Sequence, residues 1–330
     1  MVRISAASAK SARRFVHGLA LIAATAVTAA TAPVHAQSWP TKQPIKLVAV
    51  FPPGGSVDQV ARILAQPLQA QLGQTVIVEN KGGASGSIGA AFVAQAPADG
   101  YTFAVVFDSH AVNPALIPSL PFDTKKDLAA VSLIGTAAMT IATPATSEYK
   151  SFADVATALK AGKPVSYGTI GNGSLGHLAM TLLGKQNGLN WQHVPYKGGG
   201  PMMQDAVGGH VPLVIGSVFV VKPHIDSGRV RALAVTTAKR SPELPNVPAL
   251  AEVGYGQFEA PAWWAVLAPA KTPPEIVARM NAEISKALQN PDTAKKLEAQ
   301  GINLIGGAPE TARVFIEKQI DIWGKVVKDY

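Results

Sequence analysis

The 330-residue sequence contains no cysteine, few charged residues and few aromatic residues. The missing cysteines exclude a thiol nucleophile, a disulfide scaffold and a thiolate metal site. Charged side chains make up 15% of the chain and aromatic side chains 6%, and the basic residues form no stripe interleaved with aromatics, which argues against nucleic-acid binding. Hydrophobic residues make up 48%, enough for a large core, and the length exceeds what one core ordinarily holds. The composition therefore predicts a folded protein of two domains.

The first 36 residues have the pattern of a secretory signal peptide. A basic cluster precedes an uncharged apolar stretch over residues 15–32, and Val34-His35-Ala36 forms a small-x-small cleavage motif. A membrane anchor is the alternative, but a glycine and several threonines make the stretch a weak span. The basic residues of the cluster are Arg3, Lys10, Arg13 and Arg14.

Removal of this peptide would lower the net charge of the chain. The formal charge of the whole chain is +8, and loss of the four basic leader residues lowers it to +4 over the remaining 294 residues. No later stretch has the 18 consecutive apolar residues that a membrane helix needs. Twin-arginine export would use Arg13-Arg14, whose neighbours fit that signal poorly. We therefore expect Sec-dependent export to the periplasm of a Gram-negative cell.

Short apolar runs alternate with amphipathic stretches after the leader, which is typical of α/β units on mostly parallel sheets. A strand over 46–51 and a glycine-rich turn lead into a helix over 57–72, which Pro67 should bend or interrupt. Because two such sets appear, we predict two α/β lobes with a ligand cleft between them, lobe 1 from residues 37–137 and 256–330 and lobe 2 from 138–255. Further strands are predicted over 75–79, 101–107, 165–170, 191–196, 213–217, 232–237 and 258–267, together with two strands between 129 and 143.

One glycine-rich segment matches a nucleotide-binding pattern. Residues 171–176 read GNGSLG, a literal GxGxxG between a predicted strand and a predicted helix. The acid that would bind the ribose about 20 residues later is missing, because residues 190–196 contain no carboxylate. Two other interpretations stay open, a tight turn that needs glycine for positive φ and an anion site without a nucleotide.

Three glycine-rich turns, over residues 53–58, 82–89 and 171–177, each stand between a predicted strand and a predicted helix. Free N–H groups and the dipole at a helix N-terminus attract a carboxylate or a phosphate. The first and third turns contain no lysine or arginine. This pattern favours capture of a small carboxylate by backbone groups over a phosphate clamp.

Templates for catalysis match poorly. The five histidines after the leader are scattered, without HExxH or HxH, so we predict no metal site and no cofactor. Ser174 does not sit in a nucleophile elbow, because Asn172 occupies the place of the first glycine. Ser147 and Lys150 form an SxxK pair without its partner motifs. We expect no enzyme, and a secreted hydrolase that acts on a small carboxylate or ester is the alternative function.

Several polar residues near predicted strand ends keep two interpretations. Asp58 would either cap its helix or contact a ligand, and His177 would either bond within the fold or contact a ligand. Asp108, Ser109 and His110 follow a strand at its carboxyl end, where the ligands of α/β sheets collect.

Aromatic residues and one lysine raise the same question. Tyr196 is interpreted as a core residue and Lys197 as a solvated side chain. Trp263 and Trp264 are interpreted as core residues, one of which could line the cleft.

In their order and spacing, a set of short motifs resembles the extracytoplasmic solute receptors of tripartite tricarboxylate transporters, the Bug family. The resemblance covers nearly all of the chain after the leader. The motifs are FPPGGSVD at 51–58, VENK at 78–81, GSIG at 86–89, NP at 113–114, YG at 167–168, Gly171 with GS at 173–174 and HLA at 177–179, VPYKG at 194–198, PHI at 223–225, RALAV at 231–235, LAPA at 267–270 and TPP at 272–274.

This resemblance implies a bilobed type II periplasmic binding protein that closes on a small monocarboxylate or dicarboxylate, aliphatic or aromatic, and delivers it to membrane permease subunits. It also implies that backbone groups and ordered water hold the carboxylate at residues 51–58 and 167–177. We expect a monomer. The candidate ligand-binding residues are Phe51, Pro53, Gly54, Gly55, Ser56, Asp58, Gly86, Asp108, Ser109, Tyr167, Thr169, Gly171, Gly173, Ser174 and His177.

Two segments depart from the pattern of the family. Gly200-Pro201-Met202-Met203 stands where small residues are usual, and Trp263-Trp264-Ala265 stands where a single tryptophan and a glycine are common. Both departures indicate a more apolar pocket.

Overall fold

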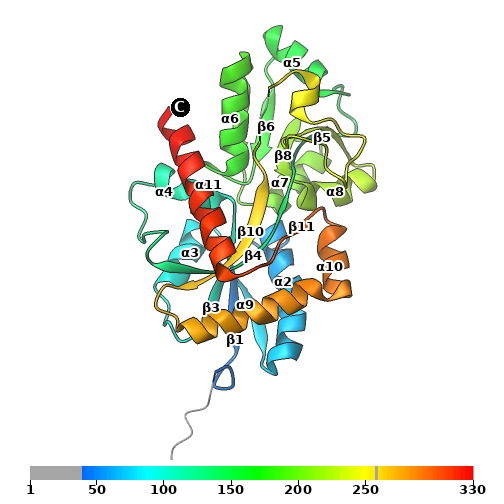
Figure 1. Cartoon of the computed structure of the whole chain (residues 1–330). Coiled ribbons are helices and arrows are strands. Elements are labelled where there is room, and N and C mark those ends of the chain that lie inside the picture. The colour runs from blue at the N-terminus through cyan, green and yellow to red at the C-terminus, as the bar shows by residue number, and fades with distance from the viewer. Residues whose placement is uncertain (1–38, 257–258, 330) are drawn as a thin grey trace, which may run out of the picture. The chain divides into compact units, whose positions relative to one another are not determined.

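The computed structural model describes residues 39–256 and 259–329 (Figure 1). The expected signal peptide lies outside the described residues. Within the described ranges, no helix combines the length and the apolar character that crossing a membrane requires.

The first of two sheets has six strands in the order β11-β4-β10-β3-β1-β2. β1 pairs in parallel with β2 and β3, whereas β10 pairs antiparallel with β3 and β4. The strands are β1 (Ile45–Ala49), β2 (Val76–Asn80), β3 (Thr102–Phe107), β4 (Leu128–Ala137), β10 (Ala262–Pro269) and β11 (Asn303–Leu304). The helices before and after these strands are α2 (Ser56–Leu72), α3 (Ser87–Ala94), α4 (Ser109–Leu116), α9 (Pro274–Gln289), α10 (Pro291–Glu298) and α11 (Pro309–Asp329).

The second sheet has five strands in the order β7-β6-β8-β5-β9. β6 pairs in parallel with β7 and β8, and β5 pairs antiparallel with β8 and β9. The strands are β5 (Met139–Pro144), β6 (Ser166–Thr169), β7 (Gln192–Pro195), β8 (Leu213–Ser217) and β9 (Val230–Val235). The helices between them are α5 (Phe152–Lys160), α6 (Leu175–Asn187), α7 (Gly199–Val207) and α8 (Val218–Asp226).

The two-sheet α/β class predicted from the sequence is confirmed, with an antiparallel strand inside each sheet. The chain leaves the first sheet after Ala137 and joins the second at Met139, with one residue between them, and it returns between β9 and β10. These crossings support the proposed lobes, and the exact lobe boundaries stay a prediction.

Helix α2 corrects one expectation. We expected Pro67 to bend or interrupt it, and the structure contradicts the interruption, because the helix continues to Leu72 and ends at Gly73 in the left-handed conformation. Leu64 and Leu68, on either side of the proline, are fully buried. Their packing holds the helix together although the proline lacks an N–H group.

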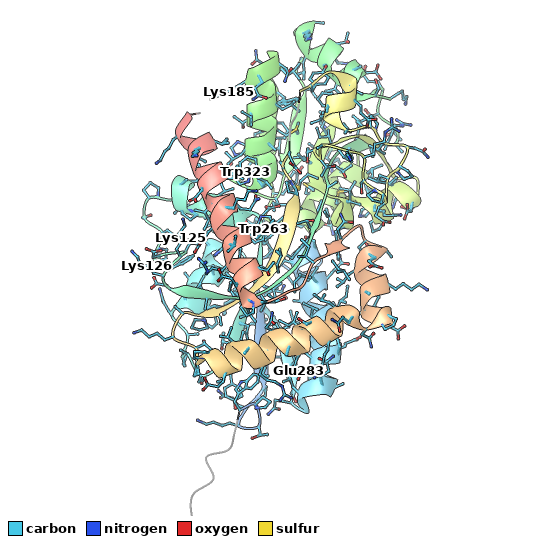
Figure 2. All side chains as sticks on the ribbon, viewed as in Figure 1. Lys125, Lys126, Lys185, Trp263, Glu283 and Trp323 are labelled. Carbon is cyan, nitrogen blue, oxygen red and sulfur yellow. The ribbon has the colours of Figure 1, made fainter. Side chains whose placement is uncertain are left out.

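Two neighbouring tryptophans of β10 lie in the core, as predicted. Trp263 and Trp264 are both fully buried, and they point to opposite faces of the sheet because side chains alternate along a strand. The Trp263 ring packs edge-on against Phe315 of α11, with ring centres 5.7 Å apart. Figure 2 labels Trp263 on β10 and Trp323 on α11. Trp264 therefore lies on the face of β10 opposite to α11.

Candidate functional site

A cavity of about 590 Å³ lies at the carboxyl ends of four strands, two from each sheet. It is bounded by the loops that follow β1, β2, β6 and β7. Ligands of α/β proteins collect at this edge of a sheet. The lining residues are Phe51, Pro52, Pro53, Asn80, Gly82, Gly83, Ala84, Ser85, Ile170, Gly171, Asn172, Pro195, Tyr196 and Lys197.

Asp58 holds the loop after β1. Its carboxylate accepts hydrogen bonds from the Gly54 N–H at 3.0 Å, from Asn80 Nδ2 at 2.9 Å and from Arg62 Nε at 3.0 Å. Burial alone would raise the pKa of Asp58, but these hydrogen bonds outweigh it and hold the pKa below its ordinary value. Gly55, and not Asp58, is the N-cap of α2. Asp58 is therefore an organiser of the cavity wall.

The loop after β2 contains two residues in the left-handed region, Ala84 with φ 46° and Ser85 with φ 51°. Non-glycine residues adopt this conformation at a cost. The Ser85 carbonyl accepts hydrogen bonds from Ser109 Oγ at 2.8 Å and from Asn113 Nδ2 at 3.1 Å, both on α4. Ser109, a predicted ligand residue, is thus bonded to this loop.

The Ser85 side chain connects the loops of the two sheets across the cavity. Ser85 Oγ donates a hydrogen bond to the carbonyl of Asn172 at 2.5 Å. A Cβ atom built at Gly171 would lie 3.2 Å from the same hydroxyl. The two walls of the cavity meet at this point.

Two backbone N–H groups of the loop after β6 donate hydrogen bonds to side chains of the same segment. The Gly173 N–H donates to His177 Nδ1 at 3.1 Å, and the Gly171 N–H donates to Thr169 Oγ1 at 3.2 Å. Ser174 Oγ accepts from the His177 N–H at 3.3 Å and caps α6. Together with the Gly54 N–H, three of the amides that the glycine-rich turns suggested as ligand donors already have partners.

His177 and Tyr167 line a different pocket, of about 310 Å³, on the other side of this loop. The His177 ring stacks on His193 with centres 4.0 Å apart. Burial lowers the pKa of His177, and it lowers the pKa of His193 to about 4. The structure therefore does not bring these two predicted residues into the cavity.

The other predicted residues also lie away from its lining. Asp108 is buried below β3, where burial raises the pKa of its carboxyl group. Gly86 packs against Val50 and Phe51, and its φ of 87° favours glycine. Of the fifteen predicted residues, Phe51, Pro53 and Gly171 line the cavity itself.

A smaller chamber of about 20 Å³ adjoins the cavity and shares Phe51 and Ile170 with it. The predicted residues Gly55 and Ser56 line it. Its other lining residues are Val57, Phe107, Met139, Gly199, Gly216, Ser217 and Val220.

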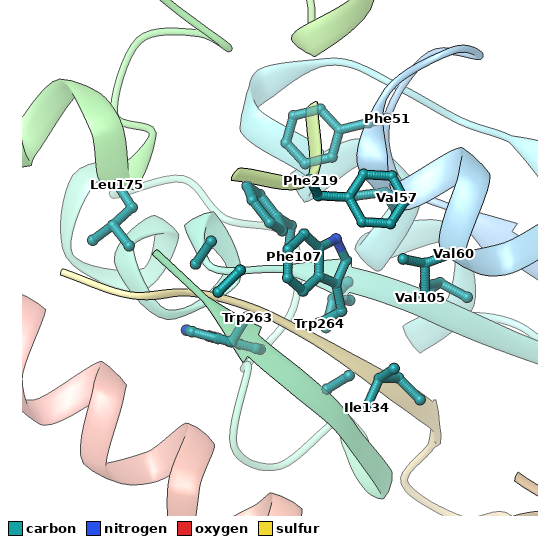
Figure 3. Packing of buried hydrophobic residues seen from close by; sticks show 14 of the residues in the cluster. Phe51, Val57, Val60, Val105, Phe107, Ile134, Leu175, Phe219, Trp263 and Trp264 are labelled. Carbon is teal, nitrogen blue, oxygen red and sulfur yellow. The ribbon is translucent and has the colours of Figure 1, made fainter. Parts of the chain in front are cut away.

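Aromatic rings pack around this chamber (Figure 3). Phe107 lies edge-on to Phe51 at 6.1 Å and 5.1 Å from Trp264, and Phe219 lies 5.8 Å from the same indole. Trp264 Nε1 donates to Ser56 Oγ at 3.3 Å. Trp264, interpreted as a core residue, therefore supports the wall of the site.

Lys197, interpreted from the sequence as a solvated side chain, is exposed, and it also belongs to the lining, which the sequence analysis did not predict. Among the described lining residues it alone carries a charged side chain, and none is an aspartate, glutamate or histidine. The neighbouring Tyr196 donates its hydroxyl to Asp205 at 2.8 Å. The sequence contained a signal that could have placed Lys197 at the site. Residues Tyr196 to Gly200 stand between a strand and a helix and are rich in glycine, like the three glycine-rich turns described above. The lining as described can hold an anion and contains no carboxylate and no imidazole.

Comparison with known proteins decides the family. A model of the tripartite tricarboxylate transporter family receptor, TctC, matches residues 60–330. The chain belongs to this family. Members of the TctC family are periplasmic binding proteins, so the resemblance found in the sequence is confirmed.

Three relatives of this TctC-family receptor show how far the similarity extends. Protein BugT of Bordetella pertussis is 38% identical over 302 residues, which are 90% of this chain and 92% of BugT. The structure of Rpa4515 from R. palustris with adipate has a TM-score of 0.84 at 36% identity and covers 88% of this chain and 97% of that one. The structure of MatC from Rhodopseudomonas palustris with bound malate has a TM-score of 0.82 at 29% identity and covers 87% and 99%.

Proposed function

We propose that this TctC-family protein captures a small carboxylate in the periplasm by closure of its two lobes and delivers it to the permease subunits of a tripartite transporter, acting as a monomer. The observation that carries the proposal is the cavity between the two sheets, whose described lining has one cation and no carboxylate. The adipate and malate in the related structures support a dicarboxylate as the ligand.

The proposed mechanism uses the two chain crossings as a hinge. Lobe 1, residues 37–137 and 256–330, and lobe 2, residues 138–255, would move about Ala138 and the β9–β10 connection. A ligand that contacts both lobes binds the closed form better than the open form, and thereby shifts the population towards it. The alternative of a secreted hydrolase gains no support from the lining.

A carboxylate panel tests this function. Protein purified from the periplasm is mixed with adipate, malate, hexanoate and benzoate, and the melting temperature and heat of binding are measured. A ligand at 100 times its Kd stabilises the folded state by about 2.7 kcal/mol, and mass spectrometry should recover it unchanged. Consumption of a panel member, or no shift with any of them, would contradict a receptor for carboxylates.

Lys197→Met should reduce the affinity for dicarboxylates about three- to fivefold, because a partly exposed ion pair contributes up to about 1 kcal/mol. Hexanoate, which has no second carboxylate to meet the ammonium group, should bind to the variant as it does to the wild type. Isothermal titration with adipate and hexanoate measures both. Lys239→Met, an exposed lysine outside the lining, is the control. An equal loss for both ligands would show that Lys197 does not select the second carboxylate.

Ser85→Ala removes the hydrogen bond between the two walls and should accelerate ligand dissociation about two- to tenfold, since such a bond contributes about 0.5–1.5 kcal/mol. Ser85→Gly removes the same bond and also relieves the left-handed backbone, so it should be more stable than Ser85→Ala. Stopped-flow dissociation of adipate and urea unfolding separate the two effects. Ser87→Ala, at the first residue of α3 after this loop, is the control. Wild-type dissociation rates in both Ser85 variants would refute a role in closure.

A further inference from the structure

Three helices begin at the wall of the small chamber. They are α2 after Gly55, α7 after Gly198 and α8 after Ser217, and none has a side-chain hydrogen bond at its N-cap. α2 follows a strand of the first sheet, whereas α7 and α8 follow strands of the second. A Cβ atom built at Gly55 would lie 3.7 Å from the Gly199 nitrogen, so the starts of α2 and α7 nearly touch across the two sheets. Three positive helix ends at one point attract an anion.

Ser217 supplies an independent observation. Its side chain lines the chamber and is 2% exposed, and Oγ has no hydrogen-bond partner within the described residues. A buried hydroxyl without a partner is costly, and native proteins rarely leave one. The N–H of Val218 is already bonded to the Ala138 carbonyl at 2.8 Å. The Ser217 hydroxyl is a donor at the start of α8 that has no partner within the described residues.

A second hydroxyl is in a similar position. Ser56 Oγ accepts from Trp264 Nε1 and keeps its own proton to donate. No described residue of the chamber wall is acidic, and most of the lining residues, Phe51 and Phe107 among them, are apolar, which strengthens interactions with charge. The wall thus provides hydroxyl and amide donors for an anion.

The size of the chamber limits which anion enters. A volume of about 20 Å³ is close to the space that one water needs, so a flat carboxylate is at the limit and a tetrahedral phosphonate or sulfonate is too large. Because the chamber and the cavity share Phe51 and Ile170, the remainder of the ligand would extend into the cavity, where Lys197 stands.

We infer that this chamber binds one carboxylate of the ligand, with Ser217 as the hydroxyl donor and the helix starts of α2 and α7 as amide donors, and that it selects carboxylates against tetrahedral anions. The inference rests on the proposed receptor function. The bound dicarboxylate then has one orientation, with one carboxylate in the chamber and the second towards Lys197.

Ser217→Ala tests the donor with adipate and malate as probes. Isothermal titration should show a loss of affinity of about ten- to a hundredfold, the range for a hydrogen bond to a charged group. The melting temperature of the free variant should stay the same or rise, since the unpaired hydroxyl is gone. Ser132→Ala is the matched control, because Ser132 Oγ on β4 is equally buried and unpaired but lines neither space. Its affinity should stay within about twofold of the wild type.

Gly55→Ala tests whether the ligand needs the volume of the chamber, because Gly55 lines it and a methyl group there would reduce that volume. Gly55 has φ −84° and ψ 174°, which alanine adopts freely, and the new methyl group would meet its nearest atoms at 3.7 and 3.8 Å. The variant should fold and lose adipate binding. The phosphonate analogue of adipate should not bind to the wild type.

Each remaining outcome decides a different question. Wild-type adipate affinity in both Ser217→Ala and Gly55→Ala, or equal binding of the phosphonate, overturns the chamber as the carboxylate site while the receptor function stands. A wild-type protein that binds no member of the carboxylate panel overturns the receptor function, and this inference with it.

Discussion

Trp264→Ala should destabilise the protein by about 3–5 kcal/mol and should also weaken carboxylate binding. The indole is fully buried, contacts Phe107 and Phe219, and donates to Ser56 Oγ. Its strand β10 lies between β3 and β4 in the first sheet. Truncation leaves a cavity in the sheet and removes the support of the chamber wall. Urea unfolding measures the first effect and titration with adipate the second.

Trp263→Ala is the matched control for this prediction. It is the preceding residue of the same strand and is equally buried, but it packs against Phe315 and lines neither the cavity nor the chamber. We expect a similar loss of stability with little change in affinity for the protein that remains folded. Trp264→Phe, which keeps a ring but loses the indole N–H, should fall between the wild type and Trp264→Ala. If both alanine variants lose affinity equally, Trp264 supports only the fold.

Asp58→Ala should have the second large effect. It leaves the Gly54 N–H, Asn80 and Arg62 without their common acceptor. Gly54 and Arg62 are exposed and Asn80 is half-buried, so water replaces part of the loss, and the substitution as a whole should cost about 1–3 kcal/mol. Asn80 also donates to the Phe51 carbonyl at 3.0 Å, so the loss should spread to the residues that line both spaces. We expect lower stability, measured by urea unfolding. We also expect at least tenfold weaker adipate binding, measured by titration, because a loss of about 1–3 kcal/mol in the binding free energy corresponds to this change.

The pH dependence of this prediction has a definite sign. Because the folded-state pKa of Asp58 is lowered from the ordinary 3.8, its carboxylate stabilises the protein at pH values above 3.8. That stabilisation is lost as the pH falls below 3.8 and through the lowered folded-state pKa. The difference in unfolding free energy between the wild type and Asp58→Asn should therefore be constant from pH 7 to pH 5 and shrink towards pH 3. A difference independent of pH would mean that Asp58 acts through shape and not through charge.

Asp154→Asn is the control for the site effect. The Asp154 carboxylate also has a lowered pKa, because the backbone N–H groups of Lys150 and Ser151 donate to it at the start of α5. It lies outside both spaces. The variant should alter the pH dependence of stability without altering adipate affinity.

Much of the scaffold could be predicted from the residues alone. The strand predicted over 213–217 coincides with β8, the one over 75–79 is shifted by one residue from β2, and the one over 101–107 begins one residue before β3. These segments are short apolar runs between turn residues, where local pattern and burial agree. Helices α4, α7 and α8 were not predicted. They are eight or nine residues long, and two contain an internal proline, so their local signal is weak.

The candidate site was predictable in outline only. The glycine-rich turns after β1, β2 and β6 do bound the cavity, since the carboxyl ends of these strands meet there. Which amides stay free could not be read from the pattern. The N–H groups of Gly54 and Gly173 are bonded to Asp58 and His177, four residues away in each case, whereas the uncapped start of α7 was overlooked.

The sequence by itself determined the α/β class and the family, it contains no thiol, and it predicts a leader for export. Each of these depends on composition, on periodicity or on short motifs, which are local. The tertiary structure alone decided that Ser85 reaches Asn172 across the cavity, that Lys197 stands in its lining, and that three helices begin around one small chamber. These contacts join residues of both sheets that are far apart in the chain. Their geometry depends on how the two sheets pack together, and no local pattern contains that information.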